Sequence, residues 1–300
     1  MNKRYIGHIS AIITILIWGT TFISTKILLN DFKPIEILFF RFLIGFVALL
    51  IIYPKRLKGT NFKQEITFAA AGVCGITLYY LLENIALTYT TASAVGVIIS
   101  TAPFFTAILS YLISKKKEKL SVSFFIGFAV SMGGICLLSF ENLSLNVSPL
   151  GNLLALLSAL VWALYSILSK KISGYGYNTI QSTRRIFLYG IVFMIPFLFL
   201  FDFKLGFSRL FDMSNVMNML FLGFGASAVC FVTWNFAVKS LGAVKTSVYI
   251  YLVPVITVVA SALVLKEKET AFSVFGIILT LLGLILSQVK KRGKTDECAK

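Results

Sequence analysis

One acidic residue, Glu83, lies well inside a long apolar stretch of the sequence. Tyr79 and Tyr80 precede it by about one helical turn, and Asn84 follows it directly. A carboxyl group in such a stretch can accept a proton or bind a cation, and intramembrane ionisable groups are functional candidates because they are costly to bury. The alternative interpretation is structural, with Glu83 as part of an ion-pair network that holds neighbouring helices together.

Three more charged residues are expected at a similar depth. Lys26, Glu36 and Arg41 lie in the outer parts of the first two apolar stretches, and the direction of the third stretch brings Glu83 toward the same side. The sequence therefore predicts an intramembrane charge network of two bases and two acids, namely Lys26, Arg41, Glu36 and Glu83.

Hydroxyl and aromatic side chains recur along the apolar stretches at spacings of three and four residues, which place them on one helix face. Pro103 and Pro254 each remove a backbone hydrogen bond, and a freed carbonyl is tolerated in a membrane where protein or a water-filled cavity surrounds it. Such hydroxyls can also simply join helices, but several aligned faces together favour a substrate cavity. The residues predicted to line it are Trp18, Thr21, Tyr80, Glu83, Ser100, Pro103, Trp162, Tyr165, Trp234, Asn235, Tyr251 and Pro254.

The elements that must position these residues are membrane-spanning helices. Of the 300 residues, 58% are hydrophobic and 13% charged, and the mean hydropathy is +0.89, whereas soluble domains carry roughly 25% charged residues. Helices are favoured because a membrane β-barrel would show short alternating segments. We therefore predict an all-α integral membrane protein with ten transmembrane helices, each near the ~20 residues that span a bilayer. The ten apolar runs lie near 8–28, 35–53, 66–89, 92–114, 121–139, 150–169, 182–201, 215–238, 243–265 and 271–289.

The same composition argues against several classes of function. There is no P-loop sequence for ATP hydrolysis, and one histidine with one central acid is a poor basis for an intramembrane enzyme. The four cysteines lack metal-ligand spacing, so we expect neither a metal nor a cofactor. A receptor is also disfavoured, because ten helices with an inverted repeat differ from the usual seven-helix receptor, and a channel is disfavoured because no filter-like loop is visible.

The net charge of +16 is unevenly distributed. With the N-terminus inside, 19 of the 28 Lys and Arg residues fall in cytoplasmic segments, including four lysines within residues 115–119. This positive-inside bias predicts that both termini are cytoplasmic. The basic excess then faces anionic lipid, and we expect no nucleic-acid partner.

The pattern occurs twice along the chain. A shift of 144 residues places Trp18 on Trp162, and a shift of 151 places Pro103 on Pro254. Duplicated hydrophobic halves are typical of secondary transporters, whose substrate site lies between the repeats. Since five helices is an odd number, the second half enters the membrane inverted. The predicted halves are residues 1–149 and 150–300.

Two further features concern the ends and edges of the helices. Arg184 and Arg185 lie near a cytoplasmic helix end with no acid nearby in sequence, so they are expected to extend to lipid headgroups; alternatively, Arg185 binds a carboxylate or phosphate of an entering substrate. Glycines seven residues apart, Gly127 with Gly134 and Gly276 with Gly283, predict close packing of the last helix of each half, either as scaffold or in a homodimer.

An ordered series of short motifs is repeated in part between the halves. Its members are Trp18-Gly19, Pro34-x-Glu36 with Arg41, Ala86-Leu87-x-Tyr89-x-x-Ala92, Pro103, Glu118 and Gly127. Over residues 6–289 the chain resembles the ten-helix, EamA-type members of the drug/metabolite transporter superfamily. The second half departs from the pattern, with Ile180 in place of Glu36 and Trp234 in place of Glu83.

The resemblance implies an inverted-repeat exporter of amino acids, nucleosides, sugars or related metabolites in the cell membrane. With the residue pattern it favours a secondary transporter that works by alternating access, with a small molecule as substrate and protons as a possible coupling ion. Uptake, or facilitated diffusion without coupling, stays open because topology does not fix the direction of transport. A monomer and a homodimer are both compatible with the sequence.

Overall fold

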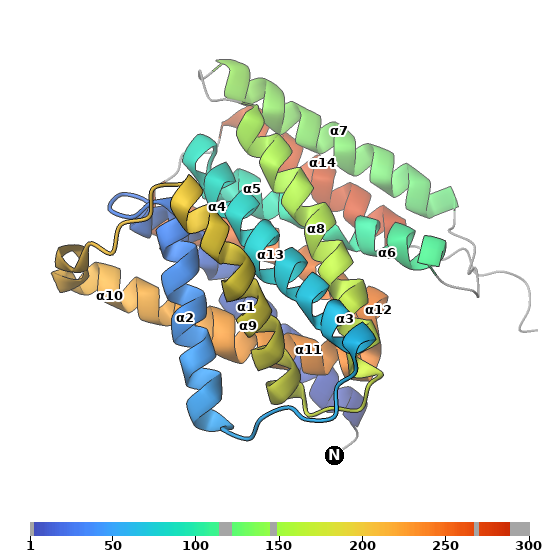
Figure 1. The fold of residues 1–300 in the computed structure, drawn as a ribbon. Helices are drawn as coiled ribbons and strands as arrows, with labels where there is room; N and C mark the ends of the chain where they lie inside the picture. The colour runs from blue at the N-terminus through green and yellow to red at the C-terminus, as the bar shows by residue number, and fades with distance from the viewer. Residues whose placement is uncertain (1–2, 114–121, 145–148, 267–269, 289–300) are drawn as a thin grey trace, which may run out of the picture.

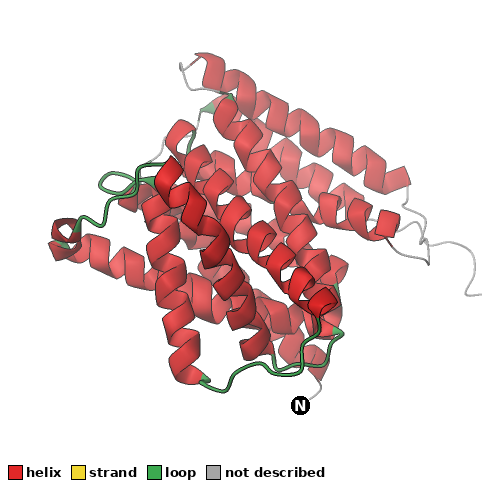
Figure 2. Ribbon diagram, viewed as in Figure 1, coloured by secondary structure: helices red, strands yellow, loops and turns green. Residues whose placement is uncertain are grey.

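A computed structural model describes residues 3–113, 122–144, 149–266 and 270–288 of the chain. All regular secondary structure in these ranges is helical (Figure 2). The predicted all-α membrane fold is confirmed. The lysines of residues 115–119, residues 1 and 2, and the C-terminal tail from 289 lie outside the described ranges, and so does the prediction of where the termini lie.

The first part of the chain forms a series of helices, which Figure 1 shows from α1 to α7. They are α1 (Lys3–Leu28), α2 (Pro34–Ile52), α3 (Phe62–Gly72), η1 (Val73–Leu78), α4 (Tyr79–Tyr89), α5 (Ala92–Ile99), α6 (Ala102–Ile113) and α7 (Val122–Ser144). Side-chain caps set some of the starts. Asn61 accepts a hydrogen bond from the backbone of Gln64 at the start of α3, and Thr91 accepts one from Ala94 at the start of α5.

The second part of the chain follows a similar order of elements. They are α8 (Leu150–Ser173), α9 (Thr179–Leu200), η2 (Phe207–Phe211), α10 (Met213–Leu220), η3 (Phe221–Val229), α11 (Cys230–Leu241), α12 (Ala243–Ser247), η4 (Val248–Leu252), α13 (Val253–Val264) and α14 (Ala271–Gln288). Asn178 and Asp212 cap α9 and α10.

Eight helical segments in the described residues are long and apolar enough to cross a membrane, and α7 and α14 contain shorter apolar stretches. The total of ten spans therefore stays a prediction. Four of the eight segments are interrupted. A π-helical stretch, η1 or η3, lies within the segments 62–89 and 213–241, and breaks at Ser100–Thr101 and at η4 divide the segments 92–113 and 243–264.

The breaks at Ser100–Thr101 and at η4 lie just before Pro103 and Pro254. Pro103 is the second residue of α6 and Pro254 the second residue of α13, so each proline begins a new helix, where its missing N–H has no cost. The two π-helical stretches were not predicted from the sequence. Isolated π turns are frequent at functional sites.

Helices of the two parts of the chain pack against each other in a reciprocal way. α1 packs on α11 and α13, while α8 packs on α4 and α6; α2 packs on α9, and α5 on α13. The core formed by these contacts is rich in aromatic side chains, with Trp234, Phe187 and Phe231 fully buried. The site described below lies within this core.

α7 and α14 pack closely along each other at one side of the bundle (Figure 1). A Cβ atom added to Gly134 would lie 2.6 Å from the carbonyl oxygen of Gly276, and the Ser131 hydroxyl donates to the carbonyl of Thr280 at 2.9 Å. The glycine faces of these two helices are thus buried against each other within one chain, as small residues allow.

We expect Gly134→Val to destabilise the protein, because the added side chain would strike the backbone of α14 and force the two helices apart. Overpacking of this kind costs about 1–3 kcal/mol. SDS-titration unfolding in mixed micelles would measure the loss. Gly133→Val is the matched control, since a Cβ at Gly133 meets only the Leu279 side chain at 3.8 Å; equal losses in the two variants would contradict the prediction.

Candidate functional site

A small cavity lies where helices of both parts of the chain meet, and α1, α4, α5, α8, η4 and α13 all contribute to its wall. Its volume is about 20 Å³, enough for about one water molecule. This conformation therefore encloses the site and has no room for an organic solute. The lining residues are Trp18, Thr21, Phe22, Tyr79, Tyr80, Glu83, Ile99, Trp162, Ile250 and Val253.

Aromatic rings form most of one wall. The Trp18 and Trp162 rings meet edge to face with centroids 5.1 Å apart, and the Tyr79 ring lies 4.8 Å from that of Trp162. Trp234 completes the group at 5.1 Å from Trp18, although it does not line the cavity. Such contacts fix ring positions more firmly than burial alone, so the wall is preorganised.

The residues at the helix breaks include Ile99 and Ile250, which line the cavity. Ile99 and Ile250 lie four residues before Pro103 and Pro254, so their carbonyl groups cannot accept the usual helical hydrogen bond. The Ile250 carbonyl instead accepts from the N–H of Val253 in a tighter turn. Both prolines thus act on this site through the backbone four residues earlier, and both isoleucines line the cavity.

Glu83 and Arg41 are the charged groups at the centre. Glu83 lines the cavity and accepts a hydrogen bond from the Tyr79 hydroxyl, and the charge of Arg41 acts on it. Arg41 is fully buried, with its guanidinium carbon 4.2 Å from the centre of the Tyr80 ring and its Nε donating to the Ser227 hydroxyl at 3.1 Å.

Several polar atoms here lack a hydrogen-bond partner within the described part of the chain. They include Oε1 of Glu83, Nη1 and Nη2 of Arg41, and the indole nitrogens of Trp162 and Trp234. Buried polar groups are normally paired, because an unmade hydrogen bond costs about 1–3 kcal/mol. Of these residues, Glu83 and Trp162 line the cavity, and an unpaired acceptor and an unpaired donor there are the arrangement expected of groups that bind a polar ligand.

The other two members of the predicted charge network lie elsewhere, so the four residues do not form one cluster. Lys26 donates to the carbonyl oxygens of Leu87 and Thr90, at 2.5 and 2.8 Å. Glu36 forms an ion pair with Arg209 at 2.6 Å and also accepts from the backbone N–H of Lys33 at the start of α2. Glu36 is paired with Arg209, which lies in the connecting segment 201–212. Helix periodicity gives no information about a residue in such a segment, so the sequence did not predict this pair.

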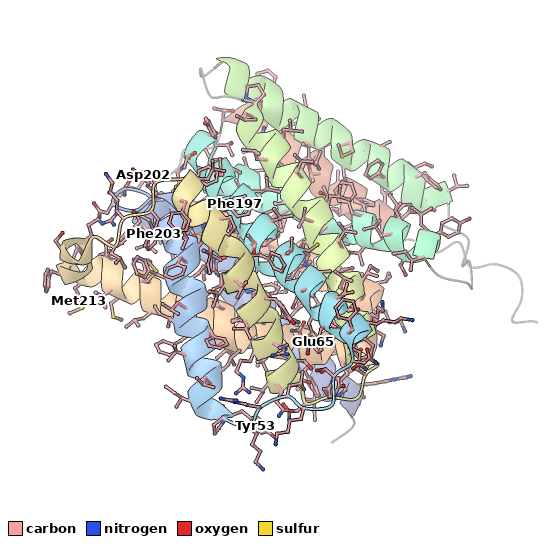
Figure 3. All side chains as sticks on the ribbon, in the orientation of Figure 1. Tyr53, Glu65, Phe197, Asp202, Phe203 and Met213 are labelled. Carbon is pink, nitrogen blue, oxygen red and sulfur yellow. The ribbon has the colours of Figure 1, made fainter. Side chains whose placement is uncertain are left out.

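The exposed loop beside this pair carries Asp202, which Figure 3 places at the same end of the bundle as Phe203. A hydrogen bond from Lys33, together with the charges of Lys33 and Lys204, holds the pKa of Asp202 below its ordinary value. This carboxylate therefore stays ionised at neutral pH, and it forms an ion pair at 2.8 Å with Lys33, the N-cap residue of α2.

Asn235 lines a second pocket of about 20 Å³, between α8, α9 and α11, and Tyr165 is hydrogen-bonded to Asn235. The Asn235 carbonyl oxygen accepts from the hydroxyls of Tyr165 and Ser169 at 2.8 and 2.7 Å, and its amide donates to Thr183 at 3.0 Å. Because these bonds pair both the oxygen and the nitrogen of the Asn235 side chain, they join α11 to α8 and α9. Of the two, only Asn235 lines the pocket itself.

The remaining predicted cavity residues also lie off the cavity wall. The Ser100 hydroxyl donates to the Val97 carbonyl at 2.5 Å within its own helix end, and Tyr251 packs beside Phe104 in a separate apolar cluster. Pro103 and Pro254 are buried at the helix starts described above. Of the twelve predicted residues, those that line the cavity are Trp18, Thr21, Tyr80, Glu83 and Trp162.

Arg184 and Arg185 have partners that the sequence did not indicate. Arg185 forms a two-point ion pair with Glu65 of α3, with Nη2 to Oε1 at 2.7 Å and Nε to Oε2 at 3.0 Å. Arg184 donates to the backbone carbonyls of Tyr53 and Lys55. Figure 3 shows Tyr53 and Glu65 at the same end of the bundle, opposite Asp202. We call this the basic end.

Sequence reasoning missed Phe22, Tyr79, Ile99, Ile250 and Val253 as lining residues. A signal existed for three of them: Phe22 lies one helical turn after Trp18, and the two isoleucines lie four residues before the prolines. Among the described residues, no three His, Cys, Asp or Glu side chains are grouped to hold a metal ion.

An all-helical membrane fold whose central cavity is formed by helices of both parts of the chain defines the class of multi-span membrane transporters. The family model for EamA-like transporters matches residues 5–140 and 149–288. The chain belongs to the EamA-like transporter family.

The chain is similar over nearly its whole length to proteins named as uncharacterized transporters. One from Archaeoglobus fulgidus is 28% identical over 296 residues, covering 97% of this chain and 99% of that protein. YyaM from Bacillus subtilis is 27% identical over 280 residues, covering 89% and 88% of the two chains. One crystal structure shares the fold, with a TM-score of 0.68, 18% identity, and coverage of 95% of this chain and 98% of that one.

Proposed function

We propose that this protein is a secondary transporter that exports a small organic metabolite, an amino acid or a related compound, across the cell membrane. The observation that carries the proposal is the central cavity, closed in this conformation, with an unpaired carboxyl oxygen of Glu83 in its surroundings. A carrier must enclose its substrate between two states, and helices contributed by both halves of the repeat can do so by rocking against each other.

Two further findings support two inverted five-helix halves, residues 1–149 and 150–300. The family model matches one segment in each half. The packing is also reciprocal, since the contact of α1 with α11 corresponds to the contact of α8 with α4. The π-helical stretches lie in the third segment of each half. An inverted repeat pairs its helices in this way. The positive-inside distribution supports cytoplasmic termini.

We assign Glu83 the role of proton acceptor. It is the acid at the cavity, Tyr79 bonds to it, and Arg41 lies behind the Tyr80 ring where it can respond to a change in the charge of Glu83. Proton binding and substrate binding would then compete for the same carboxyl, which couples export to the proton gradient.

The test is flux of a panel of amino acids and related solutes in proteoliposomes, with and without an imposed pH gradient. We expect gradient-driven flux for at least one solute and loss of the gradient response in Glu83→Gln, which preserves shape but cannot ionise. Glu65→Gln is the control, since Glu65 lies at the basic end and pairs with Arg185. Flux that does not respond to the pH gradient in either the parent protein or Glu83→Gln would contradict proton coupling and indicate a facilitator.

A further inference from the structure

A cleft at the basic end, distinct from the central cavity, lies between α2 and α9. Its volume is about 370 Å³. The segment that links α2 to α3 passes below the start of α9 in Figure 1, and its residues Arg56 and Leu57 line one side of the cleft. The Gln181 side chain donates hydrogen bonds to the carbonyls of Lys55 and Arg56 at 3.1 and 3.2 Å, which hold the segment against α9. The lining residues are Phe46, Leu50, Arg56, Leu57, Gln181, Arg184, Arg185 and Leu188.

The cleft carries uncompensated positive charge. Of its three arginines, Arg185 is paired with Glu65. Arg184 donates to the backbone carbonyls of Tyr53 and Lys55, and it lies close enough to Arg56 for the two charges to repel each other. Within the described residues, neither Arg56 nor Arg184 forms an ion pair with a carboxylate, so the site has two positive charges to offer an anion.

The rest of the cleft is apolar and faces outward. Leu50 is 40% exposed and Leu188 36% exposed, and the apolar surface continues along both helices at Val47, Ile51 and Val192. Since α2 and α9 are candidate membrane spans, this surface lies where acyl chains run. The arginines stand at the ends of those spans, at the level of lipid headgroups.

We propose that this cleft binds one anionic phospholipid, with its phosphate between Arg56 and Arg184 and its acyl chains along Leu50 and Leu188. A soluble phosphate compound would use the arginines but leave the apolar wall unused, and a zwitterionic lipid would bring its own cation toward them. Basic pockets between transmembrane helices are suited to anionic headgroups. The proposal does not depend on what the central cavity transports.

The experiment is native mass spectrometry of the detergent-solubilised protein titrated with dioleoyl phosphatidylglycerol. We expect one lipid to be retained at low concentration, with at least fivefold weaker retention of dioleoyl phosphatidylcholine. Arg56→Gln should weaken phosphatidylglycerol binding about fivefold, the usual effect of one basic residue at a membrane surface. Arg56 is exposed, so the variant keeps its fold.

Two comparisons decide between a defined site and general surface charge. Lys58→Gln removes the same charge from the same loop outside the cleft and should leave binding unchanged, whereas Leu188→Trp should fill the apolar wall and weaken binding without altering charge. Equal losses in Lys58→Gln and Arg56→Gln would overturn the proposal, as would equal retention of phosphatidylcholine. Full competition by glycerol 3-phosphate at equal concentration would also overturn it and identify a site for soluble phosphates.

Discussion

Arg41→Met is expected to lose about 3–5 kcal/mol of unfolding free energy, because it would leave the buried carboxyl group of Glu83 without a compensating positive charge. Arg41 has no exposed surface, and its charge is the one that acts on Glu83 at the centre of the bundle. Methionine retains the length of the side chain against the Tyr80 ring, so the loss would come from charge rather than from a cavity. SDS-titration unfolding in mixed micelles measures it.

The decisive comparison is a double-mutant cycle. Glu83→Gln alone should be mild, and Arg41→Met combined with Glu83→Gln should recover more than half of the stability lost in Arg41→Met, because no unpaired charge then remains at the centre. Arg41→Lys is the matched control and should fall between, since lysine keeps the charge but loses the bond to Ser227 and the planar contact with Tyr80. Losses that simply add would show that the two charges do not interact.

The general fold could be predicted from the sequence because the hydropathy of a helix reflects whether lipid or water surrounds it. A membrane span must be apolar for about 20 residues whatever it packs against, and the observed segments follow the predicted runs closely. The interruptions inside those segments did not follow. The π-helical stretches at 73–78 and 221–229 do not differ in composition from the α-helices around them. Contacts with other helices are the remaining cause, such as the Tyr165 ring that fills the space beside Gly75.

The residues of the candidate site were also predicted where helical spacing was informative and missed where contacts between helices decided the outcome. Trp18, Thr21, Tyr80, Glu83 and Trp162 were identified because helical spacing shows which residues share a face. Pairing across helices is a different matter. Glu36 meets Arg209 and Arg185 meets Glu65 across separations of 173 and 120 residues, and nothing local in the sequence states which cation a given carboxylate will face.

The two cavity tryptophans offer a comparison that separates binding from stability. A shift of 144 residues along the sequence places one on the other, yet their indole N–H groups differ. That of Trp18 donates to the carbonyl oxygen of Ala226 at 2.9 Å, whereas that of Trp162 has no partner among the residues that the structure describes. The first N–H is therefore committed to the fold, and the second is free to meet a polar group of the substrate.

We expect Trp162→Phe to raise KM about two- to tenfold for the solute that the flux panel identifies, the effect of one hydrogen bond, with unfolding free energy changed by less than about 1 kcal/mol. The phenyl ring keeps the aromatic wall, and an unpaired buried donor is removed. Trp18→Phe should do the reverse, lowering stability by about 0.5–1.5 kcal/mol through loss of the bond to Ala226 while KM changes less. Initial-rate flux and SDS unfolding on both variants test the pair. If both variants changed KM equally, ring size would set substrate affinity, and the indole N–H of Trp162 would have no part in binding.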